Sequence, residues 1–521
     1  MAKGAYKPTK THEFFSAQFK TFFIAQDIQL YGGFFGNETA LSQRDWENNK
    51  TILSGDLDGN DANVDGNNIA ETTADLVGNN AHHVLWLDHV SDAMRLDGFF
   101  ITAGKADYNQ HPFSEGGGMY VDGSEAAGVF APILANLVFS GNYAIYGGAL
   151  ANYGYLGAVN PALFNCIFSG NEASEGGGAI FNFAHEGSAA PVGMNCHFYN
   201  NSAKQGGAVY TLSFWSVSNP GFTNCSFTAN SASEEGGAMF NISFNQTATA
   251  SPVLFNCTFF GNSAGSDGGA IFNHAAFSDA SPKLTNCSFA ENTAERGLVI
   301  FNFNELASGT ANPLLTNCIL WGNDGAGSSI FNDAAAPVLR YTLLEETDCP
   351  PGAVCESSVL LNQNPLFEDV GNNNLRLSPG SPAIDVGDNS AVPPSLLSDL
   401  DGNQRIFNAT NIAVARVDLG AYEFGATSDA SDIAGAAALA LSVFPNPASS
   451  HIFLEYELPG ASEIKVSLFD FMGKELAVLA QDKRAGGSAR EEMVLPEGLA
   501  AGCYWVLLRT NFGIVAAEWM K

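Results

Sequence analysis

The sequence is poor in basic side chains. Of its 521 residues, 22 are Lys or Arg and 54 are Asp or Glu, and the formal net charge is −32. Nucleic acids and anionic membranes are bound through basic surface, so this balance argues against both as partners. It leaves room for bound cations or for a neutral glycan. Charged residues make up only 15% of the chain, whereas 39 phenylalanines provide material for a sizeable core.

Long apolar runs are also missing. The longest uncharged apolar stretch, Ile433–Phe444, is far shorter than the ~18 residues that a membrane helix needs. The opening residues, M-A-K-G-A-Y-K-P-T-K-T-H-E, are charged and contain no apolar run of signal-peptide length. We therefore expect no transmembrane segment. We also expect a protein that is either soluble or exported by a signal that does not lie at this N-terminus.

What the sequence has instead is a repeat. From Pro161 onward the pattern P-A-L-F-N-C-I-F-S-G-N recurs, with fixed offsets from Pro to Cys and from Cys to Asn. An earlier copy near Pro132 has Leu137 where the others have Cys. The repeated cysteines lie 29 to 32 residues apart, at Cys166, Cys196, Cys225, Cys257, Cys287 and Cys318. Such a period indicates units that bury their apolar faces only by stacking on one another.

Each unit predicts β-strands. Its apolar runs are short, rich in β-branched and aromatic residues, and bounded by Gly, Asn and Pro, and they show no helical periodicity. In N-C-x-F the Cys and the Phe are two residues apart, so they share one face of a strand. Stacking would place the cysteines in a column with a spacing of about 4.8 Å. The sequence therefore predicts an all-β parallel β-helix with Phe, Cys and Leu filling its bore.

Regular Asn and Gly positions fit the corners of such coils. An Asn precedes each repeated Cys, as at Asn165, and another ends each G-G-A-x-F-N strand, as at Asn182. Asn tolerates the left-handed backbone of a sharp bend, and stacked Asn side chains can form a hydrogen-bonded ladder. Paired glycines such as Gly177–Gly178 allow turns that bulkier residues cannot make. We interpret these residues as scaffold.

The cysteines do not define a compartment. Parallel side chains in the column suit disulfides poorly, so we expect reduced, buried thiols there. Cys349 and Cys355 bracket a short loop that a disulfide could close, and Cys503 is left over.

Several motifs outside the repeats carry a family resemblance. They are Y-G-G-F-F-G-N-E-T at 31–39, L-D-G-F-F-I-T-A-G at 96–104, N-P-L-F at 364–367, L-S-P-G-S-P-A-I-D-V-G at 377–387 and D-L-G-A-Y-E-F at 418–424. Together with the repeats they resemble the bacterial choice-of-anchor Q family of right-handed β-helix surface proteins. The repeats alone resemble those of chlamydial polymorphic outer-membrane proteins. The resemblance implies a right-handed parallel β-helix over residues 1–425. In that family a segment like A-K-G-A-Y-K-P-T lies in the first coils, downstream of a signal peptide, whereas here it starts at residue 2. The resemblance therefore implies an N-terminally truncated chain whose signal peptide is not present here, with a true cytosolic start as the alternative.

The composition changes after Glu423. Residues 426–441 are rich in Ala, Ser and Gly and read as a flexible linker. Short alternating strands in 442–521 predict a small immunoglobulin-like β-sandwich. This segment resembles the C-terminal sorting domain of the type IX secretion system. The resemblance implies a partner in that secretion machinery, export across the outer membrane of a Gram-negative bacterium and attachment at the cell surface. The motif residues are Pro445, Asn446, Pro447, Gly473, Lys474, Gly502, Tyr504 and Lys521.

One segment has the composition of a calcium loop. D-L-D-G-N occurs at 56–60 and again at 399–403, and oxygen ligands at alternate positions suit a hard cation such as Ca²⁺. The EF-hand pattern fails, because Asp61 and Gln404 stand where it requires Gly. The candidate ligands are Asp56, Asp58, Asn60, Asp61 and Asp65; polar turns are the alternative.

Catalytic signals are weak. Between residues 106 and 339 the only basic residues are Lys204, Lys283 and Arg296, at different offsets in their units, so no clustered base for lyase chemistry is apparent. Acid pairs on neighbouring coils could still serve a hydrolase. The loops that follow G-G-A-x-F-N vary in length, and insertions of this kind often form a binding face.

Aromatic residues in these loops are candidate contacts for a glycan or a protein: Phe214, Trp215, Phe244 and Phe277. The alternative is that they merely cover the coil edge. We expect a non-enzymatic, exported cell-surface β-helix that acts as an adhesin or structural module, with its ligand unknown. A secreted carbohydrate-active enzyme, of the polysaccharide lyase or hydrolase kind, is the alternative.

Overall fold

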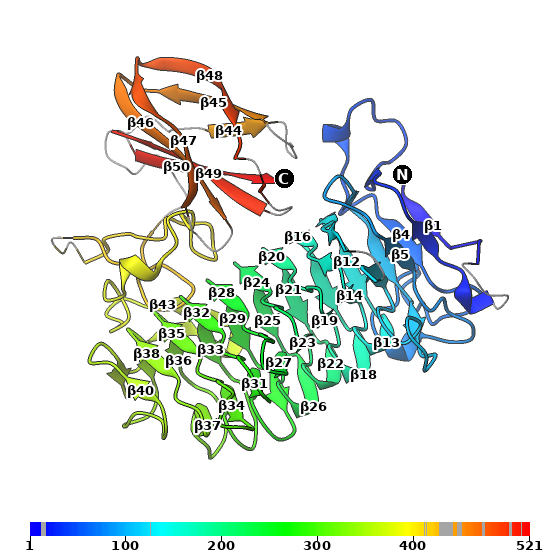
Figure 1. Ribbon diagram of the computed structural model, residues 1–521, viewed down its shortest axis with the longest axis horizontal. Coiled ribbons are helices and arrows are strands. Elements are labelled where there is room, and N and C mark those ends of the chain that lie inside the picture. The colour runs from blue at the N-terminus through cyan, green and yellow to red at the C-terminus, as the bar shows by residue number, and fades with distance from the viewer. Residues whose placement is uncertain are drawn as a thin grey trace.

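The structure is a computed structural model, and it describes residues 1–11, 17–124, 127–410, 412, 414–426, 441–444, 451–470, 475–496, 498–499, 503–511 and 513–520. The described part of the chain is a parallel β-solenoid followed by a short cap and a small antiparallel domain (Figure 1). Helical structure in it is confined to short 3₁₀ turns: η1 (Ala17–Phe19), η2 (Leu41–Gln43), η3 (Thr73–Asp75), η4 (Val370–Asn372) and η5 (Asn389–Ala391). None of its helices is long and apolar enough to cross a membrane.

The solenoid is built from parallel sheets that run along its length. The longest contains β1 (Gly4–Tyr6), β4 (Thr51–Ser54), β7 (Phe100–Thr102), β12 (Val138–Ser140), β17 (Ile167–Ser169), β21 (His197–Tyr199), β25 (Ser226–Thr228), β29 (Thr258–Phe260), β33 (Ser288–Ala290), β36 (Ile319–Leu320), β39 (Leu343–Leu344) and β41 (Leu360–Leu361). We call it the first sheet.

The second sheet contains β3 (Gln29–Tyr31), β6 (Arg95–Asp97), β11 (Ile133–Ala135), β16 (Ala162–Phe164), β20 (Val192–Met194), β24 (Gly221–Thr223), β28 (Val253–Phe255), β32 (Lys283–Thr285), β35 (Leu314–Thr316), β38 (Val338–Arg340) and β40 (Val354–Cys355). The third contains β2 (Phe22–Ile24), β5 (Leu85–Asp88), β9 (Met119–Asp122), β14 (Leu150–Tyr155), β19 (Ile180–His185), β23 (Val209–Phe214), β27 (Met239–Phe244), β31 (Ile271–Ala275), β34 (Ile300–Asn304) and β37 (Ile330–Asp333).

Two smaller sheets complete the coils. One contains β8 (Lys105–Ala106), β13 (Tyr143–Tyr146), β18 (Glu172–Gly176), β22 (Ser202–Gln205), β26 (Ser231–Glu235) and β30 (Ser263–Ala264). The other pairs β10 (Val129–Phe130) with β15 (Ala158–Val159).

The bore is filled as the repeat predicts. Phe168 pairs with Phe198 across β17 and β21, and Phe198 pairs with Phe227 across β21 and β25. Their rings are fully buried and stack with centroids 4.8 and 4.7 Å apart. All six cysteines of the column are buried and free, and a disulfide joins Cys349 to Cys355. The inward assignment of N-C-x-F and both cysteine predictions are confirmed.

The asparagine predictions are confirmed at one corner and corrected at another. The Asn before each Cys is left-handed, with φ between 50° and 56° at Asn165, Asn195, Asn224, Asn256, Asn286 and Asn317. A second column forms a buried ladder, in which Asn171 Nδ2 donates to Asn201 Oδ1 at 3.0 Å. The Asn of G-G-A-x-F-N does not end its strand. Asn182 points inward, fully buried, and β19 continues to His185.

The coils end at β41, and residues 362–426 fold back over the outside of the solenoid as a cap (Figure 1). The cap contains the antiparallel pair β42 (Phe367–Asp369) and β43 (Asn374–Leu377). Corner asparagines hold it in place: Asn286 Nδ2 donates to the Asp418 carbonyl at 3.0 Å, and Asn317 Nδ2 donates to the Asp388 carbonyl at 3.0 Å. The amide of Ala421 donates to Ser288 Oγ at 3.0 Å.

The C-terminal domain has two antiparallel sheets. One contains β44 (Leu441–Phe444), β45 (His451–Leu458) and β48 (Gly487–Val494), and the other contains β46 (Ser462–Asp470), β47 (Glu475–Arg484), β49 (Cys503–Thr510) and β50 (Gly513–Met520). Both contribute to one core, where Leu454, Val466, Val506 and Trp519 are fully buried. The predicted linker falls almost wholly outside the described residues.

Replacing Phe227 by Asp tests the packing of the bore. The substitution places an unpaired carboxylate between stacked rings, and we expect it to destabilise the protein by about 4 kcal/mol or more. Cys225→Ser in the same coil is the control and should be much milder, because only a small buried thiol changes. Far-UV dichroism and thermal melting measure both. An unchanged melting curve for Phe227→Asp would contradict the inward assignment.

The cap predicts a pH dependence. One buried cation, Arg405, lies among the buried acids Asp385, Asp399, Asp418 and Glu423, and its Nη2 is 3.4 Å from Glu423 Oε2. Burial raises the pKa of Asp418 to about 6 and that of Glu423 to about 9, against the opposing effect of Arg405.

Because these pKa values are raised in the folded state, the stability that the two groups contribute is complete only below their unfolded pKa of about 4. It is lost as the pH rises through about 6 for Asp418 and about 9 for Glu423. We expect the protection factors of cap amides, which are exchange rates corrected for their intrinsic rise with pH, to fall over this range, with each group contributing at most about 1.4 kcal/mol per pH unit. Glu423→Gln should flatten the profile, whereas Glu305→Gln, at a more exposed side chain, should not. An identical profile for Glu423→Gln and wild type would refute the assignment.

Candidate functional site

The third sheet carries an aromatic outer face. Along β14, β19, β23 and β27 alternate residues point outward, and parallel pairing aligns them in three rows. The inner row is Ala151, Phe181, Tyr210 and Phe240; the middle row is Tyr153, Phe183, Leu212 and Ile242; the outer row is Tyr155, His185, Phe214 and Phe244. Figure 1 shows these strands side by side in the middle of the solenoid.

The inner row is part of the scaffold. Phe181, Tyr210 and Phe240 are 4%, 8% and 2% exposed although they face outward. Glycine-rich turns cover them: a Cβ added at Gly176 would lie 2.6 Å from the Tyr210 ring. These rings therefore fill the angle between the third sheet and its smaller neighbour, and they are not available to a ligand.

The outer row reaches solvent. Tyr155 is 37% exposed and stacks on His185 with centroids 5.1 Å apart. Phe214 stacks on Phe244 at 4.9 Å with an interplanar angle of 9°. Since these rings stand on paired strand ends, their positions are fixed by the backbone ladder.

The residue after each of these strands has a left-handed backbone. Leu156, Glu186, Trp215 and Asn245 have φ values of 68°, 55°, 48° and 74°. Asn suits this conformation, whereas bulky residues pay strain there. Leu156 and Trp215 are nevertheless 41% and 54% exposed. Two large apolar side chains thus occupy strained turn positions and gain little burial in return, which favours a role in binding.

Trp215 lies against the outer row. Its ring centroid is 5.3 Å from that of His185 at an interplanar angle of 82°, and 6.4 Å from that of Phe214. We call the following residues the Trp215 patch: Tyr155, Leu156, His185, Phe214, Trp215 and Phe244.

The sequence identified half of this patch. It assigned Phe214 and Phe244 to loops, but the structure places them at the ends of β23 and β27. Phe277 lies in the turn after β31 and is 38% exposed, and no ring contact among the described residues joins it to the patch. Tyr155, Leu156 and His185 were missed. The alternation in Phe181, Phe183 and His185, repeated in the next coils, is the signal that could have found them.

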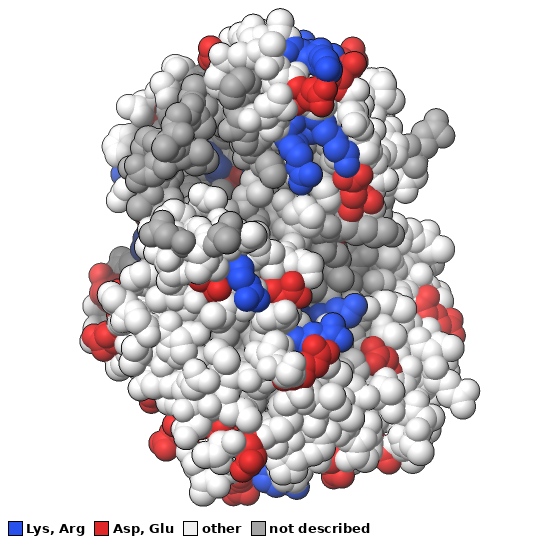
Figure 2. Space-filling model, turned by 90° about the vertical axis from the view of Figure 1, so that its left-hand side faces the viewer, with Lys and Arg blue, Asp and Glu red and all other residues white. Residues whose placement is uncertain are grey.

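The charged residue that adjoins the patch is acidic, because Glu186 follows His185 directly. Two of the three basic residues between 106 and 339 are paired with acids: Lys204 is 3.5 and 3.8 Å from carboxylate oxygens of Glu175 and Glu234, and Arg296 is 2.6 Å from Asp267. The third, Lys283, is on β32 of the second sheet. Figure 2, in which the left-hand side of Figure 1 faces the viewer, shows charged groups of both signs scattered over a mostly uncharged surface.

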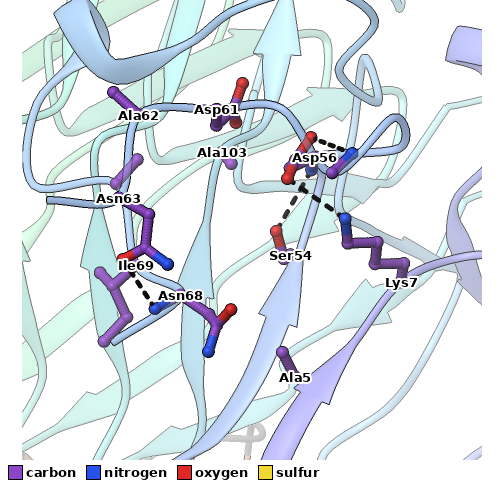
Figure 3. A pocket seen from close by; sticks show the side chains of 12 residues that line it. Ala5, Lys7, Ser54, Asp56, Asp61, Ala62, Asn63, Asn68, Ile69 and Ala103 are labelled. Carbon is purple, nitrogen blue, oxygen red and sulfur yellow. Dashed lines mark hydrogen bonds and ion pairs between the residues drawn. The ribbon is translucent and has the colours of Figure 1, made fainter. Parts of the chain in front are cut away.

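The predicted calcium residues lie in the loop after β4 (Figure 3). Asp56 and Asp61 line one cavity of about 260 Å³, together with Lys7, whose Nζ is 3.1 Å from Asp56 Oδ2. Asp61 accepts from the amide of Val77 at 2.6 Å, and burial raises its pKa.

The other members of this set take part in hydrogen bonds of their own. Asp58 Oδ2 accepts from Asn79 Nδ2 at 2.7 Å, and Asp65 Oδ2 accepts from Asn67 Nδ2 at 2.7 Å. The amide of Asn60 donates to Asp56 Oδ1 at 3.2 Å. In the second copy, Asp399 Oδ1 accepts from the amides of Asp401 and Asn403 within a cap turn. Calcium binding at Asp56–Asp65 stays a prediction.

Two protein families match parts of the chain. Residues 442–517 match the secretion system C-terminal sorting domain. Residues 165–182, 195–212 and 256–274 match the Chlamydia polymorphic membrane protein repeat. No curated protein matches the chain significantly. The sorting domain implies secretion, a secretion machinery as partner and attachment at the cell surface of a bacterium, and the solenoid fits a surface protein.

Of the sorting-motif residues, the structure describes Tyr504. It is on β49, is 6% exposed, and its ring lies 5.5 Å from that of Trp519. Seven lie outside the described residues: Pro445, Asn446, Pro447, Gly473, Lys474, Gly502 and Lys521.

The strain at Trp215 can be measured. Trp215→Gly and Trp215→Ala remove the same ring, but only Gly adopts the left-handed backbone without cost. We expect the Gly variant to be more stable by about 1 kcal/mol. At Phe214, the last residue of β23, the backbone is not left-handed, so the order should reverse, with Ala more stable than Gly by about 0.5–1 kcal/mol. Chemical denaturation gives both differences, and the same order at both positions would disprove strain at Trp215.

Proposed function

We propose that this chain is a surface-attached adhesin or binding module, built as a right-handed β-helix of the choice-of-anchor Q kind and exported through an immunoglobulin-like type IX sorting domain. The binding role is supported by one observation above the others: Leu156 and Trp215 expose large apolar side chains at turn positions that penalise them. A purely structural module would gain stability from Asn or Gly there.

The proposed division of the chain follows from its sequence and its family match. Residues 1–425 are the module that remains at the surface, 426–441 are a flexible linker, and 442–521 are the sorting sandwich, which matches the sorting family at 442–517. An accessible linker suits proteolytic removal of the sandwich during export. The host is a Gram-negative bacterium with that secretion route.

Export can be tested by deletion. In such a host, with a signal peptide fused upstream, a chain lacking Val443–Lys521 should accumulate in the periplasm, because the machinery no longer recognises it. The full chain with the same signal peptide is the control and should reach the surface. Surface labelling and cell fractionation measure both. If the truncated chain still reaches the surface, the C-terminal domain is an ordinary binding module and the localisation is wrong.

The alternative function is a secreted carbohydrate-active enzyme of the lyase or hydrolase kind. The adjacent histidines His82 and His83 are candidate bases, but both are buried, and burial lowers the pKa of His83 to about 3, which makes it a weak base. Turnover of uronate or neutral glycans at enzyme-like rates would favour this alternative and reject the adhesin.

A further inference from the structure

We infer that the Trp215 patch binds a neutral, hydroxyl-rich polysaccharide. The inference rests on the proposed function, since it names the ligand class of the same surface. It draws on three features of the patch: free aromatic surface, one sign of charge, and regular repetition along the solenoid.

Trp215 and Tyr155 present aromatic surface that their neighbours do not cover. Rings within a stack face one another, but Trp215 stands at 82° to His185 and is 54% exposed. Tyr155 pairs with His185 on β19, whereas β9 ends at Asp122, opposite Tyr153 and two residues short of the level of Tyr155. Tyr and Trp supply large, rigid contact area at little cost in side-chain entropy. The C–H bonds of a sugar ring carry partial positive charge and pack well on the electron-rich face of an aromatic ring.

Polar groups beside these rings match hydroxyl groups. The carboxylate of Glu186 is an acceptor, and sugar hydroxyls are donors. Glu186 is exposed in the turn that follows His185, so its carboxylate is open to a ligand, whereas Nδ1 of His185 is buried. Orientation and specificity at sugar-sized sites come from a few such polar groups set among aromatic ones.

Charge excludes the acidic polysaccharides. Uronate or sulfate groups on the patch would meet Glu186 in a chain of net charge −32, and two of the three basic side chains between residues 106 and 339, Lys204 and Arg296, are already paired with acids. An anionic ligand would therefore be repelled without compensation. A neutral polymer avoids this cost and keeps its contacts with the rings.

The patch also repeats. The ring centroids along the outer row are 5.1 Å apart for Tyr155 and His185, 6.1 Å for His185 and Phe214, and 4.9 Å for Phe214 and Phe244, so the row has one ring per coil over four coils. The pairing of the strand ends fixes the positions of these rings. A regularly spaced surface suits a ligand that is itself a regular chain, because several units can bind at once and raise the avidity.

The test uses the full chain and named probes. We would measure binding of residues 1–521 to cellulose, mannan and starch as neutral polymers, and to alginate and heparin as anionic ones, by affinity electrophoresis or by depletion. Trp215→Ala should weaken binding to the preferred neutral polymer about tenfold or more. Tyr199→Ala is the matched control, because Tyr199 is 41% exposed on β21 of the first sheet, and it should bind like wild type. Far-UV dichroism checks that both variants fold.

Each outcome decides something. The inference is supported if the chain binds a neutral polymer, Trp215→Ala weakens that binding and Tyr199→Ala leaves it unchanged. Preference for alginate or heparin, equal losses in both variants, or no binding to the neutral polymers overturns it. The proposed function is judged separately by adhesion of cells that display the chain to protein-coated and glycan-coated surfaces. If cells adhere only when Trp215 is intact but the chain does not bind the neutral polymers, the ligand class alone is refuted. If Trp215→Ala leaves adhesion unchanged, the binding patch itself is refuted.

Discussion

The structure depends on the in-register pairing of each coil with the next. Because every strand sits opposite its equivalent one repeat away, like side chains stack on like: Phe168 on Phe198, and Asn171 on Asn201. Because each coil packs in register on the coil before it and the coil after it, a substitution in one coil changes its contacts with both neighbours. The same alignment turns an outward aromatic residue in one coil into a row of rings, which is how the scaffold generates the Trp215 patch.

The parts of the fold that the sequence predicts are those that recur in every unit. The Cys column, the inward Phe and the left-handed Asn before each Cys follow from offsets, since a residue needed at a fixed place in a coil is needed once per repeat. The Asn182 position was misjudged because Asn looks like the end of a strand. Here its side chain is fully buried in the bore, and β19 continues outward to His185.

The patch and the cap were harder to predict. Trp215 carries no turn signal, so its left-handed backbone could be found only from coordinates. The cap depends on contacts between residues far apart in the chain, such as Asn286 with Asp418. Nothing in the local pattern around either residue specifies the other. The calcium loop shows the converse: its acids fit a cation by composition, yet Lys7 and backbone amides already bind Asp56.

The cap has a mechanical consequence. In a protein that is attached to the cell surface at its C-terminal side, tension between the point of attachment and the solenoid would pass through residues 362–426. The cap does not hang from the last coil alone, since it is bonded to Asn286, Ser288 and Asn317 in earlier coils. Tension is therefore shared among several coils and acts on their contacts together. A load on the terminal strand alone would instead separate the strand pairs one after another, starting from the last coil.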